Sequence, residues 1–309
     1  MEKQQITNYK KSGNGICFFA YNNPKIDYVQ LAHIAAAYVK QNMKNNNTCL
    51  VTDAGTFGWL EQSIDKEWHA ACFDDVILTD LPSIENPRKH YDSPWTEFSA
   101  PFYNNNKNNI FELTPYEKTL LVDIDYHIQN NFYDYIFDTD VPLAMHKNVR
   151  YLEHQPPYLN ECELNEAGIH HWWSTVVYFD QSEESKIFFD IWDHVKDNWD
   201  YYTLLYQFPP GLFRTDFCVS IAAHLLNGYN NNNFVDDFMG VKMINMDQKD
   251  DLIEVKSAKD LILLVHDRKE PWKNILTRLE NENVHLMNKR ALSRHADKFK
   301  EILVEGFSK

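Results

Sequence analysis

The stretch Glu117-Lys118-Thr119-Leu120-Leu121-Val122-Asp123-Ile124-Asp125 places an apolar run directly before two carboxylates. The run is typical of a buried strand. In a strand, the side chains of Asp123 and Asp125 leave the same face because their spacing matches the period of two. Neighbouring carboxylates repel each other, and hard oxygen ligands of this kind suit Mg²⁺ or Mn²⁺. The stretch therefore predicts a metal site that holds a nucleotide diphosphate.

A second pair of aspartates has the same spacing, in Asp138-Thr139-Asp140. It follows Tyr135-Ile136-Phe137 without a clean strand leading into it, and an acidic chain produces such spacings by chance. We interpret this pair as surface or capping aspartates. The preceding strand, and not the spacing alone, distinguishes the first pair.

The composition is that of a folded globular chain. Its 309 residues allow one large domain or two small ones, and a content of 44% hydrophobic and 14% aromatic residues is enough for a substantial core. The formal net charge of -15 argues against a wide electrostatic footprint on nucleic acid or on an anionic membrane. A local basic groove stays open.

The cysteine pattern indicates a reducing compartment. The five cysteines are odd in number and scattered, and no C-x-x-C pair suggests zinc or redox chemistry. The chain starts with a polar stretch, and no segment approaches the roughly 18 apolar residues that a membrane span needs. We therefore expect a cytoplasmic protein with no membrane partner.

Strand and helix patterns alternate along the first part of the chain. Apolar runs at 16–21, 48–52 and 75–79 each end in a polar residue and a turn, and 28–43 has apolar residues at helical spacing. This rhythm predicts an α/β fold with a single Rossmann-like, mostly parallel sheet and helices on both faces. Ligands bind beyond the carboxyl ends of such strands, where these side chains would gather: Asn22, Asp53, Asp80 and Asp123.

Two common phosphate-binding motifs are absent from the sequence. No G-x-G-x-x-G follows the first strand, and no G-K-[ST] occurs anywhere. A metal ion would have to do what those glycine-rich loops do elsewhere.

Residues 86 to 118 carry weaker signals. Arg88-Lys89-His90 brings together three side chains that can be cationic, which either contact a phosphate, with Arg88 as the candidate, or form a solvated turn. The stretch 93–98, with Pro94 in a first turn, is compatible with a helix start. We interpret the asparagine-rich run 104–109 as a polar loop without a site.

The second half continues the alternation. We expect strands at 141–146 and 174–180, and an amphipathic core helix that is capped by Ser182. The long connection 147–167 is a candidate lid.

An aromatic and imidazole-rich segment precedes the strand at 174–180. His170 and His171 would point to opposite faces of a strand and so would not share one metal. Trp172 or Trp173 either stacks on a sugar or base or packs in the core.

Two further candidate residues follow. Asp216 stands after a Pro-Gly loop at the head of the expected helix 217–226, where it either pairs with Arg214 or faces substrate. The strand 261–265 ends in His266, an available metal ligand with basic residues just after it.

The combination of these motifs resembles the GT-A glycosyltransferases, most closely the glycogenin-like group known as family eight. The strand before Asp123-Ile124-Asp125 is similar to the family's D-x-D motif, 173–180 to a later strand, and Val265-His266 with Pro271-Trp272 to its terminal H-x-G-x-x-K-P-W element. These motifs span most of residues 16 to 275. The resemblance implies a GT-A fold and metal-dependent transfer of a sugar from a nucleoside-diphosphate donor to an acceptor hydroxyl.

The resemblance also implies roles for individual residues. Asp123, Asp125 and His266 would bind Mn²⁺ or Mg²⁺, which holds the donor's diphosphate. Lys269 is the nearest candidate for the family's phosphate-binding lysine. The other expected catalytic residue, on our own reading of the sequence, is Asp216, which would orient donor or acceptor, or act as a base if the reaction inverts. Four residues would lie near the base and nucleoside of the donor: Ala20, Tyr21, Asn22 and Asp53.

The chain departs from the family pattern in two places. The terminal element lacks its glycine and has Glu270 where the family has lysine, and Ser174-Thr175 stand where the family usually has Asn-x-Gly. These departures leave the donor sugar open. The chain is also similar to proteins of tailed bacteriophages, which would place it in the host cytoplasm.

We expect one catalytic domain over 1–280 and a helical extension, basic on one side, over 281–309 that packs on it. Two alternatives to the expected transfer remain open. One is a phage enzyme that glycosylates hydroxylated bases in DNA. The other is a non-catalytic sugar- or nucleotide-binding protein on the same fold. The acceptor is thus a glycan, a protein or a modified DNA base.

Overall fold

We analysed a computed structural model of the chain. It describes these residues: 10–80, 86–104, 106–147, 149–152, 163–164, 169–208, 213–229, 234–239, 243–267, 269–270 and 272–307. Most of the candidate lid at 147–167 and the Pro-Gly loop before Asp216 lie outside them.

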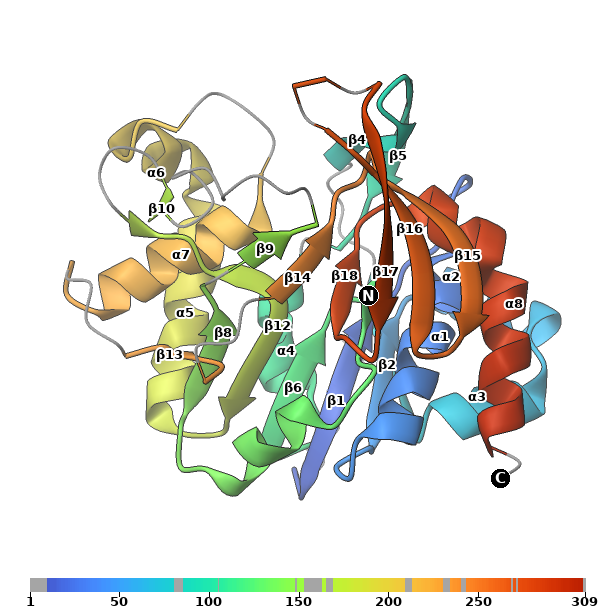
Figure 1. The fold of residues 1–309 in the computed structure, drawn as a ribbon. Helices are drawn as coiled ribbons and strands as arrows, with labels where there is room; N and C mark the ends of the chain where they lie inside the picture. Colours follow the sequence, from blue (N-terminus) through green and yellow to red (C-terminus); the bar gives the residue numbers. More distant parts are fainter. Residues whose placement is uncertain are drawn as a thin grey trace.

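A seven-stranded mixed sheet forms the centre of the fold (Figure 1). Its strands, in spatial order, are β13 (Asp236–Asp237), β8 (Leu143–His146), β12 (Trp173–Asp180), β6 (Lys118–Val122), β1 (Asn14–Phe19), β2 (Thr48–Thr52) and β3 (Asp75–Leu78). Only β12 runs against its neighbours, β6 and β8, and the other paired strands of this sheet are parallel. The predicted mostly parallel α/β sheet is confirmed.

Helices cover both faces of this sheet, as predicted. Alternate side chains of β1 enter two different cores: Ile16 and Phe18 face one, Cys17 and Phe19 the other. The first core is closed by α1 (Tyr28–Asn42) with α3 (Lys66–Cys72) and α8 (Lys289–Phe307), and the second by α5 (Glu183–Asp197) and α7 (Thr215–Leu226). Figure 1 shows α5 and α7 on one side of the sheet and α1, α3 and α8 on the other.

Smaller sheets flank the central one and bring distant segments together. The first has the order β7 (Tyr126–His127), β18 (Val284–Leu286), β14 (Met243–Met246), β9 (Val149–Tyr151). The second has the order β15 (Asp251–Ser257), β16 (Asp260–His266), β17 (Asn274–Glu280). The remaining short elements are α2 (Ala54–Ser63), α4 (Ile110–Leu113), α6 (Trp199–Leu205), the 3₁₀ helices η1 (Lys107–Asn109) and η2 (Phe132–Asp138), and the pair β10 (Glu163–Leu164) and β11 (Ile169–His170).

The expected helix start at 93–98 is wrong. The segment instead forms a hairpin of β4 (Asn86–Ser93) and β5 (Thr96–Phe102). The hydroxyl of Ser93 accepts hydrogen bonds from the backbone N–H groups of Trp95 and Thr96, at 3.2 and 3.1 Å. These are the contacts of a helix cap, but here they close a turn between two strands.

The C-terminal tract is not helical from its start. Residues Val284–Leu286 form β18, which pairs with β7, and α8 begins only after Asn288. The side chain of Asn288 accepts a hydrogen bond from the backbone N–H of Ala291 at 3.0 Å, which is the contact of a helix cap. Helix α8 then packs on α1. Within the described residues, no helix has the length and apolarity to cross a membrane.

A buried histidine in α1 makes stability depend on pH. His33 Nδ1 donates to the carbonyl of Val29 at 2.7 Å, which leaves Nε2 to accept from His69 Nδ1 at 2.9 Å. Burial lowers the pKa of His33 from 6.5 to about 3, so its imidazole is neutral in the folded state. The unfolded chain takes up the proton below pH 6.5, and the folded chain does so only near the lower pKa of about 3.

We therefore expect this group to lower the free energy of unfolding by about 1.4 kcal/mol for each pH unit below 6.5, until the folded-state pKa is reached. Urea unfolding of wild type and His33→Gln, near neutral pH and at mildly acidic pH, measures how the free energy of unfolding depends on pH. The variant should lose stability less steeply on acidification. Equal slopes in the two proteins would contradict the assignment.

Candidate functional site

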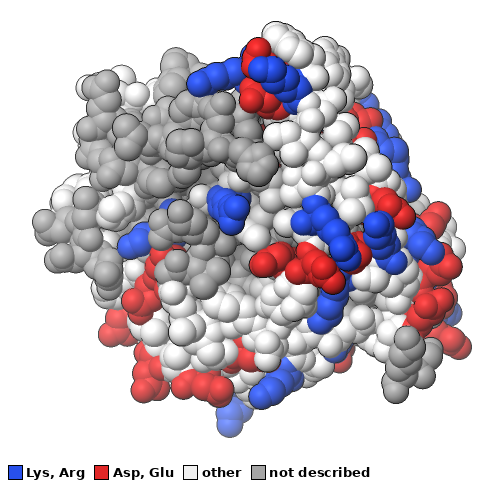
Figure 2. All heavy atoms as spheres, viewed as in Figure 1, with Lys and Arg blue, Asp and Glu red and all other residues white. Residues whose placement is uncertain are grey.

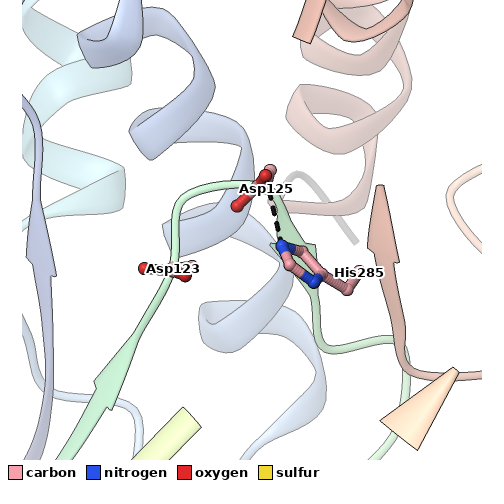
Figure 3. A group of neighbouring side chains, drawn as sticks. All are labelled: Asp123, Asp125 and His285. Carbon is pink, nitrogen blue, oxygen red and sulfur yellow. Dashed lines mark ion pairs between the residues drawn. The ribbon is translucent and has the colours of Figure 1, made fainter. Parts of the chain in front are cut away.

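Two aspartates and one histidine converge where β6 ends. Asp123 and Asp125 follow β6 directly, and His285 comes from β18. One ligand atom of each residue lies within 4.8 Å of the others, and His285 Nε2 is 3.3 Å from Asp125 Oδ2. Figure 3 shows both aspartates on the turn after β6 with the imidazole beside Asp125.

Backbone hydrogen bonds hold the turn that carries the aspartates. The N–H of Asp123 donates to the carbonyl of Thr175 in β12 at 2.8 Å. The carbonyl of Asp125 accepts from Leu286, the neighbour of His285 in β18, also at 2.8 Å. The turn is thus fixed between the central sheet and the strand that supplies the histidine.

The other ring nitrogen of His285 sets its tautomer. Nδ1 lies 3.2 Å from the side-chain oxygen of Asn245 in β14, and both side chains are buried. Because an amide oxygen only accepts, Nδ1 carries the proton and Nε2 turns a lone pair toward Asp125. A cation between Nε2 and the carboxylates would relieve this contact, as in metal sites whose histidines are oriented by a second partner. Two carboxylate oxygens and one imidazole nitrogen therefore fit a divalent metal such as Mn²⁺.

Two lysines lie against the same aspartates. Lys107 of η1 forms an ion pair with Asp123, and Lys289 at the start of α8 forms one with Asp125. Burial would raise the pKa of Asp125, but the ammonium group of Lys289, together with the neighbouring His285, outweighs burial and holds the pKa of this carboxyl well below its usual range. Asp125 is therefore ionised and available as a ligand at neutral pH.

A cleft of about 1600 Å³ opens at this cluster, large enough for a substrate of nucleotide-sugar size. It lies at the carboxyl end of β6, where ligands of α/β sheets bind. Among the side chains lining it, the Tyr21 hydroxyl, His90 Nε2 and Trp173 Nε1 are buried atoms with no hydrogen-bond partner among the described residues. Buried donors of this kind are usually satisfied, so a bound polar ligand is their natural partner.

Arg88 lines the cleft. Its guanidinium lies over the ring of Phe102, 3.8 Å from the ring centroid, and donates to the carbonyl of Phe213 at 3.2 Å. These contacts fix the orientation of a planar cation that suits phosphate or carboxylate oxygens.

Asp216 also lines the cleft, in the first turn of α7. Its Oδ1 accepts hydrogen bonds from the N–H and the hydroxyl of Ser174, at 3.0 and 2.8 Å. Arg214 lies 3.9 Å from Oδ2. Burial would raise the pKa of Asp216, but Arg214, His171 and the two hydrogen bonds lower it below its ordinary value. The carboxylate is thus ionised and rigidly held.

The structure does not bring His266 into the metal-ligating group. His266 ends β16, which pairs with β15 and β17 in a separate sheet. The backbone N–H of His266 donates to the carboxylate of Asp250 at 2.9 Å. The imidazole ring packs edge-on against Trp95, with ring centroids 5.6 Å apart. Lys269, in the next loop, is exposed, and its N–H donates to Asp267 at 2.8 Å. It is not among the residues that line the cleft.

Of the four residues expected near the nucleoside, only Tyr21 lines the cleft. The other three make structural contacts at the ends of β1 and β2. Asn22 accepts from the N–H of Val29, Asp53 caps α2, and the Ala20 carbonyl accepts from the hydroxyl of Thr52.

Three functional candidates were missed in the sequence: Lys107, His285 and Lys289. Lys107 lies in the asparagine-rich run that we interpreted as a loop without a site. His285 and Lys289 lie in a tract that we expected to be one helix. The capping residue Asn288 was the available signal, because it marks a helix start and leaves His285 in a preceding strand.

Charged side chains do not form one large patch on the face drawn in Figure 2. Lys and Arg are interspersed with Asp and Glu across the coloured surface. That distribution agrees with the net charge of -15 in giving no wide basic footprint on this face.

No protein-family model matches the sequence, and no curated protein matches it. Two solved glycosyltransferases are similar in shape. GlyE of Streptococcus pneumoniae TIGR4 is 10% identical over 74% of this chain and 45% of its own, with a TM-score of 0.40, so the chain spans less than half of GlyE. The galactosyltransferase LgtC, in complex with donor and acceptor sugar analogs, is 11% identical over 94% of this chain and 95% of its own, with a TM-score of 0.48. Both TM-scores lie below 0.5, so we assign neither a fold family nor an activity from them.

Proposed function

We propose that the protein is a metal-dependent glycosyltransferase of the GT-A type, which moves a sugar from a nucleoside-diphosphate donor to an acceptor hydroxyl. The observation that carries this proposal is the convergence of Asp123, Asp125 and His285 in the lining of a large cleft, beside basic side chains. A metal held by these three residues would stabilise the negative charge that develops on the departing diphosphate.

The cationic side chains of the cleft would bind the diphosphate. Lys289 takes the role that we expected of Lys269, because it lines the cleft and Lys269 does not. Arg88, fixed on Phe102, would add a bidentate contact to phosphate oxygens. Donors held in advance at the leaving group lower the barrier without reorganising during the reaction.

The remaining polar groups of the cleft suit the nucleoside and sugar of the donor. The hydroxyl of Tyr21 and the Nε1 of Trp173 are unpartnered among the described residues, and sugars and bases offer hydrogen-bond acceptors to such donors. Aromatic faces in the same cleft would stack on the flat side of a base or a sugar ring.

Asp216 would orient the donor or the acceptor, or would act as the base. We expect Asp216→Asn to lower the rate of transfer by about a hundredfold or more, because the amide cannot accept a proton. Binding of metal and nucleotide should persist, since this residue lies outside the ligand group. Initial rates and nucleotide titrations measure the two effects separately.

Asp190→Asn is the matched control for this prediction. Asp190 lies on the exposed side of α5, where its carboxylate pairs with Lys186 at 2.7 Å. Equal rates for Asp216→Asn and Asp190→Asn would remove Asp216 from the reaction. Loss of nucleotide binding in Asp216→Asn would move its role to the donor site.

The proposed function is tested by incubating the protein with a panel of nucleoside-diphosphate sugars, with Mn²⁺, Mg²⁺ or EDTA. We expect one donor to be cleaved slowly even without acceptor, with water in its place, and only when a metal is present. Binding without cleavage of any donor would favour the non-catalytic alternative. If no donor is bound or cleaved at millimolar concentration, the proposal is overturned.

A further inference from the structure

We infer that Lys107 is a positioning residue for Asp123, and that Lys107 and Lys289 together fill the metal site with their ammonium groups until a diphosphate arrives. Metal and nucleoside diphosphate would then bind tightly only as a pair. The inference rests on the proposed function, because it concerns the same metal and the same donor.

Lys107 is an unusual lysine because it is almost entirely buried. Only 4% of its surface is exposed, whereas lysines are rarely buried without a partner. Its ammonium group pairs with Asp123 and lies 3.5 Å from the carbonyl of Ser174. Both the carboxylate and the ammonium line the cleft. The positive charge of Lys107 therefore lies beside Asp123 in the cleft and not on the outer surface.

The asparagine-rich loop around Lys107 is braced from α5. The amide of Asn108 donates to Asp193 at 2.6 Å. Lys196 donates to the side-chain oxygens of Asn106 and Asn108, at 2.9 and 3.3 Å. These contacts with two residues of α5 hold η1 in place, so the position of the Lys107 ammonium is set by the fold.

The charges of the cluster explain why metal and nucleotide would be coupled. With Lys107 on Asp123 and Lys289 on Asp125, two carboxylates are neutralised by two ammonium groups. A divalent ion alone would have to displace these groups and would leave two unpaired positive charges in a largely buried cluster. A diphosphate brings the negative charge that the released ammonium groups need. The exchange is thus favourable for the pair of ligands and unfavourable for the metal alone.

Titration of Mn²⁺, followed by the electron paramagnetic resonance signal of the free ion, tests the inference. The probes are Mn²⁺ alone and Mn²⁺ with UDP, GDP, ADP or CDP, each measured against the same solution without protein. In wild type we expect at least about tenfold tighter Mn²⁺ binding with the preferred nucleotide than without nucleotide. In Lys107→Met, binding of Mn²⁺ alone should tighten about tenfold, because one competing cation is gone.

Two variants separate this effect from a merely structural one. Lys118→Met removes a lysine at the other end of β6, whose ammonium group donates to the carbonyls of Phe137 and Thr139, both at 2.8 Å. It should leave Mn²⁺ affinity unchanged. Lys107→Arg keeps the charge and should keep the coupling. If Lys107→Met does not fold, as judged by circular dichroism, Lys289→Met tests the same exchange at Asp125.

The outcomes distinguish the inference from the function beneath it. Equal Mn²⁺ affinity with and without nucleotide in wild type, unchanged in the folded lysine variant, would overturn the coupling and leave the metal-dependent transferase intact. Absence of Mn²⁺ binding in every protein and with every nucleotide would overturn both.

Discussion

Replacing His285 with alanine is expected to abolish metal-dependent binding of nucleoside diphosphate, whereas His266→Ala leaves it intact. His285 presents Nε2 to Asp125 at 3.3 Å and is oriented by Asn245, while His266 lies outside the ligand group and packs against Trp95. Even a residue that only orients a metal ligand contributes about 10- to 100-fold to metal affinity. Loss of the ligand itself should cost at least that much. Thermal shifts with Mn²⁺ and nucleotide, with and without EDTA, measure the effect.

His266 is a closely matched control for His285, because both side chains are buried and both lie at or next to the end of a strand. Circular dichroism and unfolding midpoints without ligand establish that each variant is folded. If His266→Ala loses the metal-dependent shift and His285→Ala keeps it, the ligand set is the one expected from the sequence motif. That result would contradict the assignment of His285 as the third metal ligand.

Asp125→Asn is expected to reduce transfer by about a thousandfold. A bound metal contributes several kcal/mol of charge stabilisation at the leaving group, and several kcal/mol corresponds to about three powers of ten in rate. The amide keeps the size of the side chain but removes the charge that attracts the metal and pairs with Lys289. Initial rates at saturating donor and Mn²⁺ measure the loss.

The second aspartate pair of the chain supplies the control. Asp138→Asn changes an exposed residue at the end of η2, in the pair that the sequence marked as a surface feature. Its rate should equal that of wild type. Equal rates for Asp125→Asn and wild type would show that no essential metal is held at Asp125.

The central strands were predictable because each is determined by its own side chains. The run Thr48–Thr52 is buried over its whole length and forms β2 with the expected bounds, and the helix expected at 28–43 is α1. Ser182 caps α5 by accepting from the N–H of Ser185, as its position suggested. Strands buried on both faces need continuous apolar runs, so such runs identify them reliably.

The hairpin at 86–102 and the strand β18 were not predictable in the same way. Both carry polar residues, and their strands are stabilised by pairing with a partner strand. Pro94 and Ser93 would suit either a helix start or a turn, and only the partner strand decides between them. In such segments, pairing with a partner strand decides the secondary structure more than the intrinsic preferences of the residues do.

The same distinction separates the parts of the site. Asp123 and Asp125 were found because an apolar run typical of a buried strand ends directly before them, although both lie on the turn after β6 and not in the strand itself. His285 was not found because it reaches them only through the pairing of β18 with β7, two segments far apart in the chain. Lys107 was not found because the asparagine-rich sequence around it is typical of a solvated loop. Only the structure shows that residues of α5 hold this segment in place.

The most direct test of the proposed metal centre is anomalous X-ray scattering at the manganese edge, from crystals grown with Mn²⁺ and the nucleoside diphosphate that gives the largest thermal shift. We expect one strong anomalous peak at coordination distance from Asp123, Asp125 and His285. Diphosphate oxygens should be the other ligands of the metal, and both lysines should contact the phosphates. A crystal that contains the nucleotide but has no anomalous peak at these three residues, or has its peak at His266, would contradict the proposed site.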